Sequence, residues 1–122
     1  MYIINGKEYK CSVTATLDIF NDRWKLAIIW HLLAENKRFK DLHQCISEIS
    51  QKTLTIKLKE LEEKKIVNRE VFAEVPPKVV YSLTPAGERL RPILKEMNIW
   101  GISYAKEHGK ISEDHIFCEE NI

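Results

Sequence analysis

The 122-residue chain contains little glycine, proline or cysteine: four, four and three residues respectively. So few glycines and prolines exclude long low-complexity linkers over most of the sequence. A hydrophobic share of 44% is ordinary for a globular protein and sufficient for one core. The length fits one domain, since domains usually have ~100–200 residues.

Long apolar runs are also lacking. The longest is Leu26–Trp30, far short of the ~20 residues of a membrane span. Residues Met1–Tyr9 include two charged residues and no apolar stretch typical of a signal peptide. The three cysteines, at positions 11, 45 and 118, are odd in number and widely spaced, which argues against a disulfide framework. We therefore expect a cytoplasmic protein without a membrane partner.

Motifs for catalysis and metal binding are missing as well. The sequence has no glycine-rich phosphate loop and no Ser/His/Asp spacing typical of a hydrolase. His43 with Cys45, and His115 with Cys118, each supply two potential ligands but not the paired spacing of a zinc finger. We predict no enzyme activity, no cofactor and no metal site.

The net charge of +1 hides an uneven distribution. Six basic and two acidic residues lie from Lys37 to Lys59, whereas two basic and five acidic residues lie from Lys106 to Ile122. A local basic stretch fits contact with phosphates, but a solvated helix face explains many such runs equally well. We expect residues 1–109 to form the folded domain and residues 110–122 an acidic, flexible tail.

Two helices are predicted in the first third of the chain. Ser12 is placed to cap a short helix through about Phe20. Residues 23–34, RWKLAIIWHLLA, favour a strong helix that is apolar all round and therefore needs burial on more than one side. In so small a chain, we expect this helix to contact both the core and a partner chain.

A helix-turn-helix is predicted next. After a short extended piece at Arg38–Phe39, helices are expected at 40–46 and 51–64, with Ser50 as the N-cap of the second. Leu54, Leu58 and Leu61 recur at i, i+4 and i+7 of that second helix and form its inward stripe, opposite Lys52, Ile56 and Lys59.

A hairpin and a long helix complete the pattern. Alternation predicts strands at 66–73 and 79–83, joined by the proline-filled tip Glu74–Lys78. Thr84 and Pro85 predict the start of a helix to about His108, kinked at Pro92. Its apolar stripe comprises Leu90, Leu94, Met97, Gly101 and Tyr104, flanked by Ile93 and Trp100. The order indicates a mainly helical α+β fold of the winged helix-turn-helix type.

In such a fold the second helix of the pair enters the major groove of DNA. Helix 51–64 is the predicted recognition helix, and Lys78 at the hairpin tip either reaches the DNA backbone or is a plain exposed turn residue. For Ile56, contact with a thymine methyl and packing against a loop stay equally open. The predicted DNA contacts are Arg38, Lys40, Ser50, Gln51, Lys52, Thr53, Thr55, Lys57, Lys59 and Lys78.

An ordered series of short motifs resembles the HxlR-type winged-helix regulators, which are DNA-binding dimers of bacteria and archaea. The series runs from Cys11 to Gly101, about three-quarters of the chain. It includes Arg23-Trp24-Lys25, Arg38-Phe39, Ile49-Ser50-Gln51-Lys52, Leu58-Lys59-Glu60-Leu61-Glu62, Arg69-Glu70-Val71, Glu74-Val75-Pro76-Pro77-Lys78-Val79, Tyr81-Ser82-Leu83-Thr84, Leu90-Arg91-Pro92 and Trp100-Gly101.

The resemblance implies a homodimer held by the first and last helices, with paired recognition helices on a pseudo-palindromic operator. The all-round apolar helix and the final stripe favour the same dimer on physical grounds. The predicted interface residues are Leu17, Trp24, Leu90, Leu94, Met97, Trp100 and Tyr104.

The resemblance also draws attention to Cys11. In several members of the family a cysteine near the first helix senses electrophiles, quinones or hypochlorite, and Cys11 matches it, although Ser12 stands where the family often has proline. A thiol near a helix N-terminus and beside Lys10 should have a lowered pKa. Against this, a lone cysteine more often fills a gap in the core, as we expect for Cys45.

The leading hypothesis is a transcription regulator that binds DNA as a homodimer and controls nearby genes in response to redox, electrophile or small-molecule stress. The alternative is a dimeric protein-interaction module of the same fold without operator binding. An aromatic groove near Trp24, Trp30 and Trp100 is either an effector site or dry packing, with packing as the default.

Overall fold

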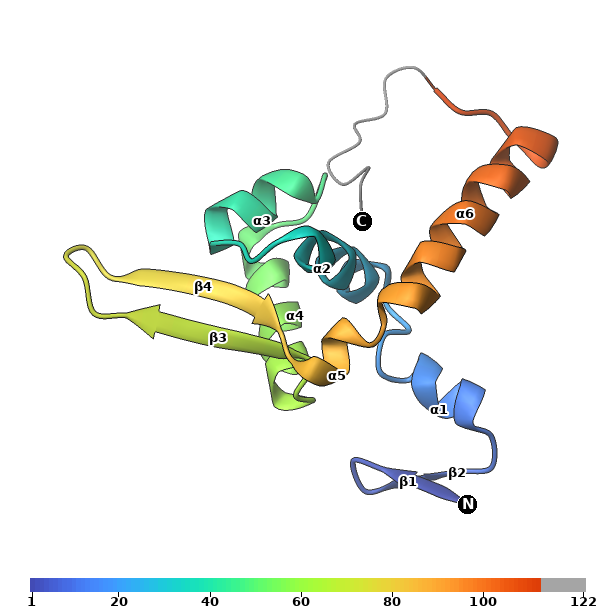
Figure 1. Ribbon diagram of the computed structural model, residues 1–122, viewed down its shortest axis with the longest axis horizontal. Helices are drawn as coiled ribbons and strands as arrows, with labels where there is room; N and C mark the ends of the chain where they lie inside the picture. The colour runs from blue at the N-terminus through green and yellow to red at the C-terminus, as the bar shows by residue number, and fades with distance from the viewer. Residues whose placement is uncertain (113–122) are drawn as a thin grey trace.

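The computed structural model describes residues 1–112 (Figure 1). Its elements are β1 (Tyr2–Ile4), β2 (Lys7–Tyr9), α1 (Ser12–Leu17), α2 (Arg23–Ala34), α3 (Phe39–Cys45), α4 (Gln51–Glu63), β3 (Val67–Phe72), β4 (Lys78–Leu83), α5 (Pro85–Glu88) and α6 (Arg91–His108). Helices α2 to α4 with the β3–β4 hairpin form a winged helix-turn-helix, and the predicted fold class is confirmed. Among these residues no helix is both long and apolar enough to cross a membrane.

Both ends of α4 are closed by local hydrogen bonds. At the start, the Ser50 hydroxyl accepts from the backbone N–H of Thr53 at 3.0 Å, as expected for an N-cap. At the end, Lys65 takes a left-handed conformation (φ 61°), and the N–H of Ile66 donates to the carbonyl of Leu61 at 3.0 Å. The left-handed residue and this bond at the C-terminal end form a Schellman motif, which ends the helix and turns the chain into β3.

The core lies between α2, α3, α4 and the base of the hairpin. Leu54, Leu58 and Leu61 of α4 are fully buried, as the leucine stripe predicts. On α2, the central apolar residues on both sides of the helix lie inside a single protomer. These buried residues are Ile28, Ile29, Leu32 and Leu33. The all-round apolar pattern of α2 is therefore explained largely within one chain.

Strands β3 and β4 pair antiparallel, with Val67 opposite Leu83 and Phe72 opposite Lys78. A third short segment joins them: Lys37 exchanges two backbone hydrogen bonds with Tyr81, of 2.8 and 3.0 Å. The extended piece predicted at Arg38–Phe39 is thus shifted, because Phe39 already belongs to α3.

The N-terminal hairpin was not predicted. Strands β1 and β2 pair antiparallel around Asn5 and Gly6, both with positive φ. An Asn-Gly pair between two strand-forming segments is a strong hairpin signal, because both residues tolerate the backbone of a type I′ turn. The signal is present in the sequence; the strands are only three residues long.

The prediction of one long, kinked C-terminal helix is wrong. The chain forms α5, turns at Arg89 and Leu90, and begins again as α6 with Pro92 in its first turn. Proline lacks a backbone N–H and is well tolerated at a helix start, so it begins the second helix instead of bending one. Thr84 caps α5 as predicted, accepting from the N–H of Gly87 at 3.1 Å.

Two smaller expectations also change. The N-cap of α1 is Cys11, while Ser12 is its first helical residue. Most of the tail predicted at 110–122 lies outside the described residues, together with His115 and Cys118.

Candidate nucleic-acid interface

The outward face of α4 is polar at its N-terminal half. Lys52 and, two turns further on, Lys59 are exposed on the side opposite the buried leucines, and Gln51 and Thr55 are exposed on a flank of the helix. Ile56 leaves 45% of its surface exposed, so no neighbouring loop of the protomer buries it. An exposed helix face with amide, ammonium, hydroxyl and one apolar group offers several kinds of contact to base edges and phosphates.

Three hydroxyls predicted to contact DNA also hold the helix together. Ser50 Oγ donates to Thr53 Oγ1 at 2.9 Å, and Thr55 Oγ1 donates to the Gln51 carbonyl oxygen at 2.8 Å. The hydroxyl protons of Ser50 and Thr55 are therefore engaged within the helix, whereas Thr53 Oγ1 acts as the acceptor of the first bond. Among the exposed residues named above, Gln51, Lys52 and Lys59 are therefore the ones that offer side-chain donors to a ligand.

Lys57 does not occupy the place predicted for it. Its Nζ forms an ion pair with Asp22 Oδ2, and the two side chains are only 22% and 20% exposed. Asp22 is the N-cap of α2, where its other oxygen accepts from the N–H of Trp24 at 2.7 Å. Lys57 thus ties α4 to α2, and we leave it out of the proposed DNA contacts.

A second ion pair has the same function. Lys25 of α2 is buried, and its Nζ lies 2.6 Å from Glu60 Oε2 of α4. With Lys57 and Asp22, this pair fixes the rotation of α4 about its axis, because both pairs lie on the side toward α2. The rotation determines which α4 side chains face solvent.

The remaining predicted contacts lie on α3 and the hairpin. Arg38, the N-cap of α3, and Lys40 are both exposed. Lys78, at the first position of β4, lies with its Nζ 5.4 Å from the centre of the Phe72 ring. The hairpin extends away from the helices as the wing (Figure 1), so its basic group is well separated from α4 along the molecule.

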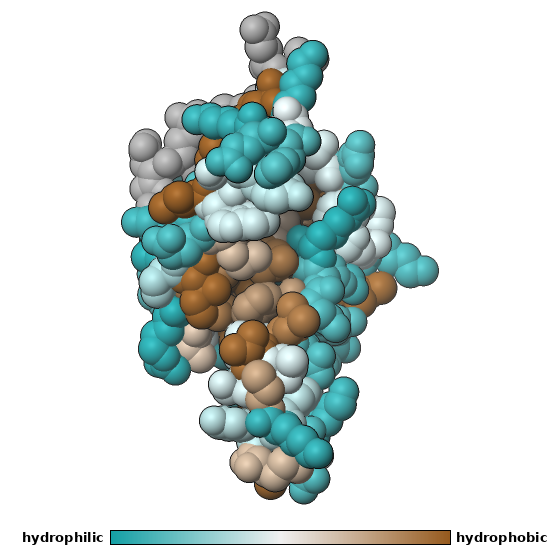
Figure 2. Space-filling model, turned by 90° about the vertical axis from the view of Figure 1, so that its right-hand side faces the viewer, coloured by the Kyte–Doolittle hydropathy of each residue, from teal (hydrophilic) through white to brown (hydrophobic). Residues whose placement is uncertain are grey.

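A second surface, on α6, is apolar. The exposed side chains Ile93, Met97, Trp100 and Tyr104 recur at intervals of four, three and four residues, the spacing of a helix–helix seam. Trp100 is 66% exposed and stacks on Tyr104 at 4.8 Å between ring centres. The face on the α6 and α1 side gathers hydrophobic side chains at its centre (Figure 2), and α1 adds the exposed Val13 and Leu17.

Two residues predicted for a dimer interface belong instead to the protomer core. Leu90 and Leu94 are 9% and 4% exposed and pack within the main hydrophobic cluster. Trp24 is half-buried against that cluster, with the Arg23 guanidinium over its ring at 4.2 Å. Periodicity showed that these positions are apolar but could not tell burial in the protomer from burial between protomers.

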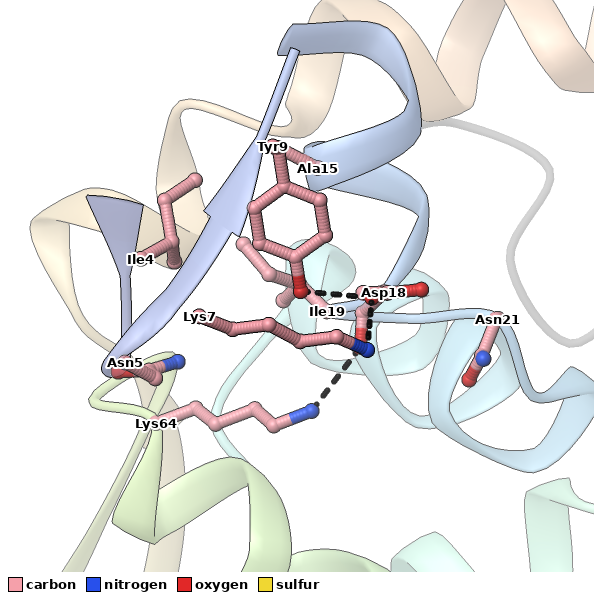
Figure 3. Close-up of a pocket in the computed structure, with 9 residues that line it drawn as sticks. All are labelled: Ile4, Asn5, Lys7, Tyr9, Ala15, Asp18, Ile19, Asn21 and Lys64. Atoms are coloured by element: carbon pink, nitrogen blue, oxygen red, sulfur yellow. Dashed lines mark hydrogen bonds and ion pairs between the residues drawn. The ribbon is translucent and has the colours of Figure 1, made fainter. Parts of the chain in front are cut away.

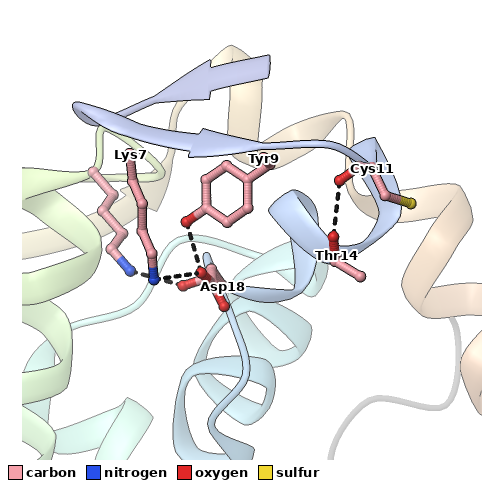
Figure 4. Close-up of polar contacts among 6 residues, drawn as sticks. Lys7, Tyr9, Cys11, Thr14 and Asp18 are labelled. Atoms are coloured by element: carbon pink, nitrogen blue, oxygen red, sulfur yellow. Dashed lines mark hydrogen bonds and ion pairs between the residues drawn. The ribbon is translucent and has the colours of Figure 1, made fainter. Parts of the chain in front are cut away.

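Cys11 is exposed at the N-cap of α1, and its side chain points away from the nearby polar cluster (Figure 4). The backbone N–H groups of Thr14 and Val13 lower the pKa of the thiol, since they stabilise the thiolate at the helix start. The direction agrees with the expectation, and its main cause is the helix N-terminus and not Lys10. Cys45 of α3 is partly buried.

Within residues 1–112 no group of three histidine, cysteine or acidic side chains is arranged to hold a metal ion. The second of the two His/Cys pairs noted in the sequence lies outside that range.

Comparison with known proteins assigns this arrangement to a family. Residues 19–109 match the model of the HxlR-like helix-turn-helix family. The HTH-type transcriptional regulator YdeP of Bacillus subtilis is 41% identical over 101 residues, which cover 83% of this chain and 79% of the relative.

Solved structures show the same fold. The redox regulator HypR in its reduced form superposes with a TM-score of 0.75 at 41% identity, covering 80% of this chain and 96% of the other. The reduced form of the transcriptional regulator YodB from B. subtilis gives a TM-score of 0.70 at 36% identity, with coverages of 82% and 98%.

The Lys57–Asp22 pair generates a prediction about stability. Burial alone raises the pKa of Asp22, but hydrogen bonds from Lys57 and the Trp24 N–H outweigh it, so the pKa lies below the ordinary 3.8. A depressed carboxyl pKa stabilises the fold above the unfolded-state pKa, and this stabilisation is lost as the pH falls through the folded-state value. Asp22→Asn, which can still cap α2, should lower the free energy of unfolding at pH 7 by about 1–2 kcal/mol.

Urea unfolding between pH 2 and 7 checks this. The difference between wild type and Asp22→Asn should shrink as the pH falls below 3.8. A difference that stays constant across this range would show that the pair contributes nothing.

Proposed function

Since this chain belongs to the HxlR-like helix-turn-helix family and is a transcriptional regulator of that type, we propose that it binds double-stranded DNA as a homodimer in the cytoplasm and controls nearby genes. The observation that carries the proposal is the exposed polar face of α4, held outward by two ion pairs beside a wing that carries Lys78. A helix of this kind fits the major groove, which is wide enough to admit it.

The contacts divide by chemistry. Gln51 at the start of α4 can pair with an adenine edge, and Ile56 can meet a thymine methyl. Positive charge for the phosphates comes from Lys52, Lys59, Arg38 and Lys40. The free backbone N–H groups at the start of α4 also attract a phosphate. Lys78 on the wing contacts the backbone beside the adjacent minor groove.

The dimer forms through the seam on α6 together with α1. A stripe of Ile93, Met97, Trp100 and Tyr104 open to water is unfavourable for an isolated chain, and a two-fold copy of the same stripe can cover it. Two protomers related in this way present two α4 helices to one side of DNA, which suits a pseudo-palindromic operator.

The signal is an oxidant or electrophile acting at Cys11. Two observations support this: the thiol is exposed with a lowered pKa, and the fold is similar to the redox regulator HypR, solved in oxidised and reduced forms. Covalent change at the N-cap of α1 acts on the helix that contributes to the dimer surface.

The DNA contacts predict distinct effects for three lysines. Lys52→Ala and Lys59→Ala should each weaken binding on all sequences and reduce the slope of log affinity against log salt by about 1. Lys57→Met should leave that slope unchanged, because its Nζ is paired with Asp22. Fluorescence anisotropy of a labelled duplex from the region upstream of the gene, between 50 and 200 mM salt, measures this. Binding that does not respond to salt in the wild type would refute DNA recognition.

The seam predicts the oligomeric state. Trp100→Glu places a charge in the centre of the stripe and should convert the dimer to a monomer, while circular dichroism stays the same because Trp100 is outside the core. Lys95→Glu, exposed on another side of α6, is the matched control and should remain dimeric. Light scattering after size-exclusion chromatography gives the mass. A dimeric Trp100→Glu protein would contradict the proposed interface.

The lowered pKa predicts selective chemistry at Cys11. Diamide or hypochlorite should modify Cys11 faster than Cys45, as located by peptide mass spectrometry, and should change DNA affinity. Cys11→Ser should bind DNA like the reduced wild type and lose the response to oxidant. An undiminished response in Cys11→Ser would exclude Cys11 as the sensor.

A further inference from the structure

A cleft of about 400 Å³ lies between the N-terminal hairpin, α1 and the end of α4. Its volume falls within the ~300–1,000 Å³ typical of small-molecule sites. The cleft is lined by Asn5 at the hairpin turn, by Asp18, Ile19 and Asn21 after α1, and by Lys64, the C-cap of α4. The hairpin lies outside the part of the chain that matches the family model, residues 19–109.

Polar side chains from three elements converge in this cleft (Figure 3). Asp18 Oδ2 accepts from the Tyr9 hydroxyl at 2.6 Å and lies 3.3 Å from Lys7 Nζ. Lys64 Nζ donates to the backbone carbonyl of Asp18 at 3.0 Å. The hydrogen bond from Tyr9, together with Lys7, keeps the pKa of Asp18 below its ordinary value, so the carboxylate is ionised and engaged.

The charges around Lys64 do not balance. Asp18 is matched by Lys7, and Glu60 is matched by Lys25 at 2.6 Å. Lys64 is the third cation of this group, and desolvation followed by repulsion from Lys25 lowers its pKa, although attraction to Glu60 and Asp18 acts in the opposite direction. A negative charge beside Lys64 would stabilise its ammonium ion and so counteract both effects.

The walls of the cleft are in part apolar. Ile4 and Ile19 line it together with the ring of Tyr9, next to the amides of Asn5 and Asn21. A ligand with an anionic head and a small apolar body meets both kinds of surface.

We propose that this cleft binds a small organic carboxylate, with its head between the ammonium groups of Lys7 and Lys64 and its body against Tyr9 and the isoleucines. Lys64 ends α4 and Asp18 directly follows α1. An occupied cleft therefore links the N-terminal hairpin to α1, which contributes to the proposed dimer surface, and to α4, the proposed recognition helix. The binding site stands on its own geometry; its effect on DNA rests on the proposed function.

Benzoate is the probe, and neutral benzamide and the small anion acetate are the controls. Each compound is titrated into the protein at constant ionic strength, and binding is followed by NMR of the Asn side-chain amides. Benzoate should shift the Asn5 and Asn21 signals saturably and bind at least about tenfold more tightly than either control. Lys64→Met should weaken benzoate about tenfold, and Lys95→Met should have no effect. Asp18→Asn removes a negative charge from the cleft and should strengthen benzoate binding. The test therefore holds even if Lys64→Met fails to fold.

Equal binding of benzoate and benzamide, or benzoate binding unchanged in both Lys64→Met and Asp18→Asn, would overturn the site. Anisotropy with DNA then separates the two proposals. Saturating benzoate should change the Kd for DNA in the wild type and not in Lys64→Met. Benzoate binding without any DNA binding would refute the proposed function and leave the site intact, whereas DNA binding without benzoate binding would do the reverse. Benzoate binding with an unchanged Kd for DNA would overturn the link to α4.

Discussion

The rest of the structure depends on the packing of α4 against α2. Leu54, Leu58 and Leu61 bury one side of α4, and the pairs Lys25–Glu60 and Lys57–Asp22 fix its rotation. An apolar stripe alone tolerates some rotation, because hydrophobic contact is not directional. Charged pairs with defined geometry are directional, and breaking a largely buried one leaves an unpaired charge. The face that α4 presents to solvent is thereby set by residues that never touch a ligand.

The last helix shows how one stretch of apolar residues serves two purposes. Leu90 and Leu94 belong to the core of the protomer, while Met97, Trp100 and Tyr104 are exposed. Arg91 fixes the junction: its Nη2 donates to the carbonyl of Leu33 at the end of α2, 2.8 Å away. Helix α6 thus starts beside α2 and extends away from the helix-turn-helix and the hairpin (Figure 1). In the proposed dimer, any change in how the two α6 stripes meet would move the two α4 helices relative to each other.

Features set by local chemistry could be predicted from the sequence. The Ser50 cap, the leucine stripe and the order of the elements from α1 to β4 follow from spacing and hydrogen-bonding capacity, and α4 ends within one residue of its predicted end. Features that depend on which residue a side chain contacts could not be predicted from the sequence. Nothing in the spacing of Lys57 reveals Asp22, 35 positions away, and an apolar Leu94 looks the same whether its neighbour is in the same chain or another. The hairpin at Asn5-Gly6 is different, because its signal was present and local.

The central claim is that two copies of this chain present paired α4 helices to one DNA duplex. Selection of bound duplexes from a random library by the purified protein tests it most directly. We expect enrichment of an inverted repeat whose half-sites are centred about one helical turn, or a multiple of it, apart. Enrichment of a single half-site without a repeat, or no enrichment over the starting library, would contradict it.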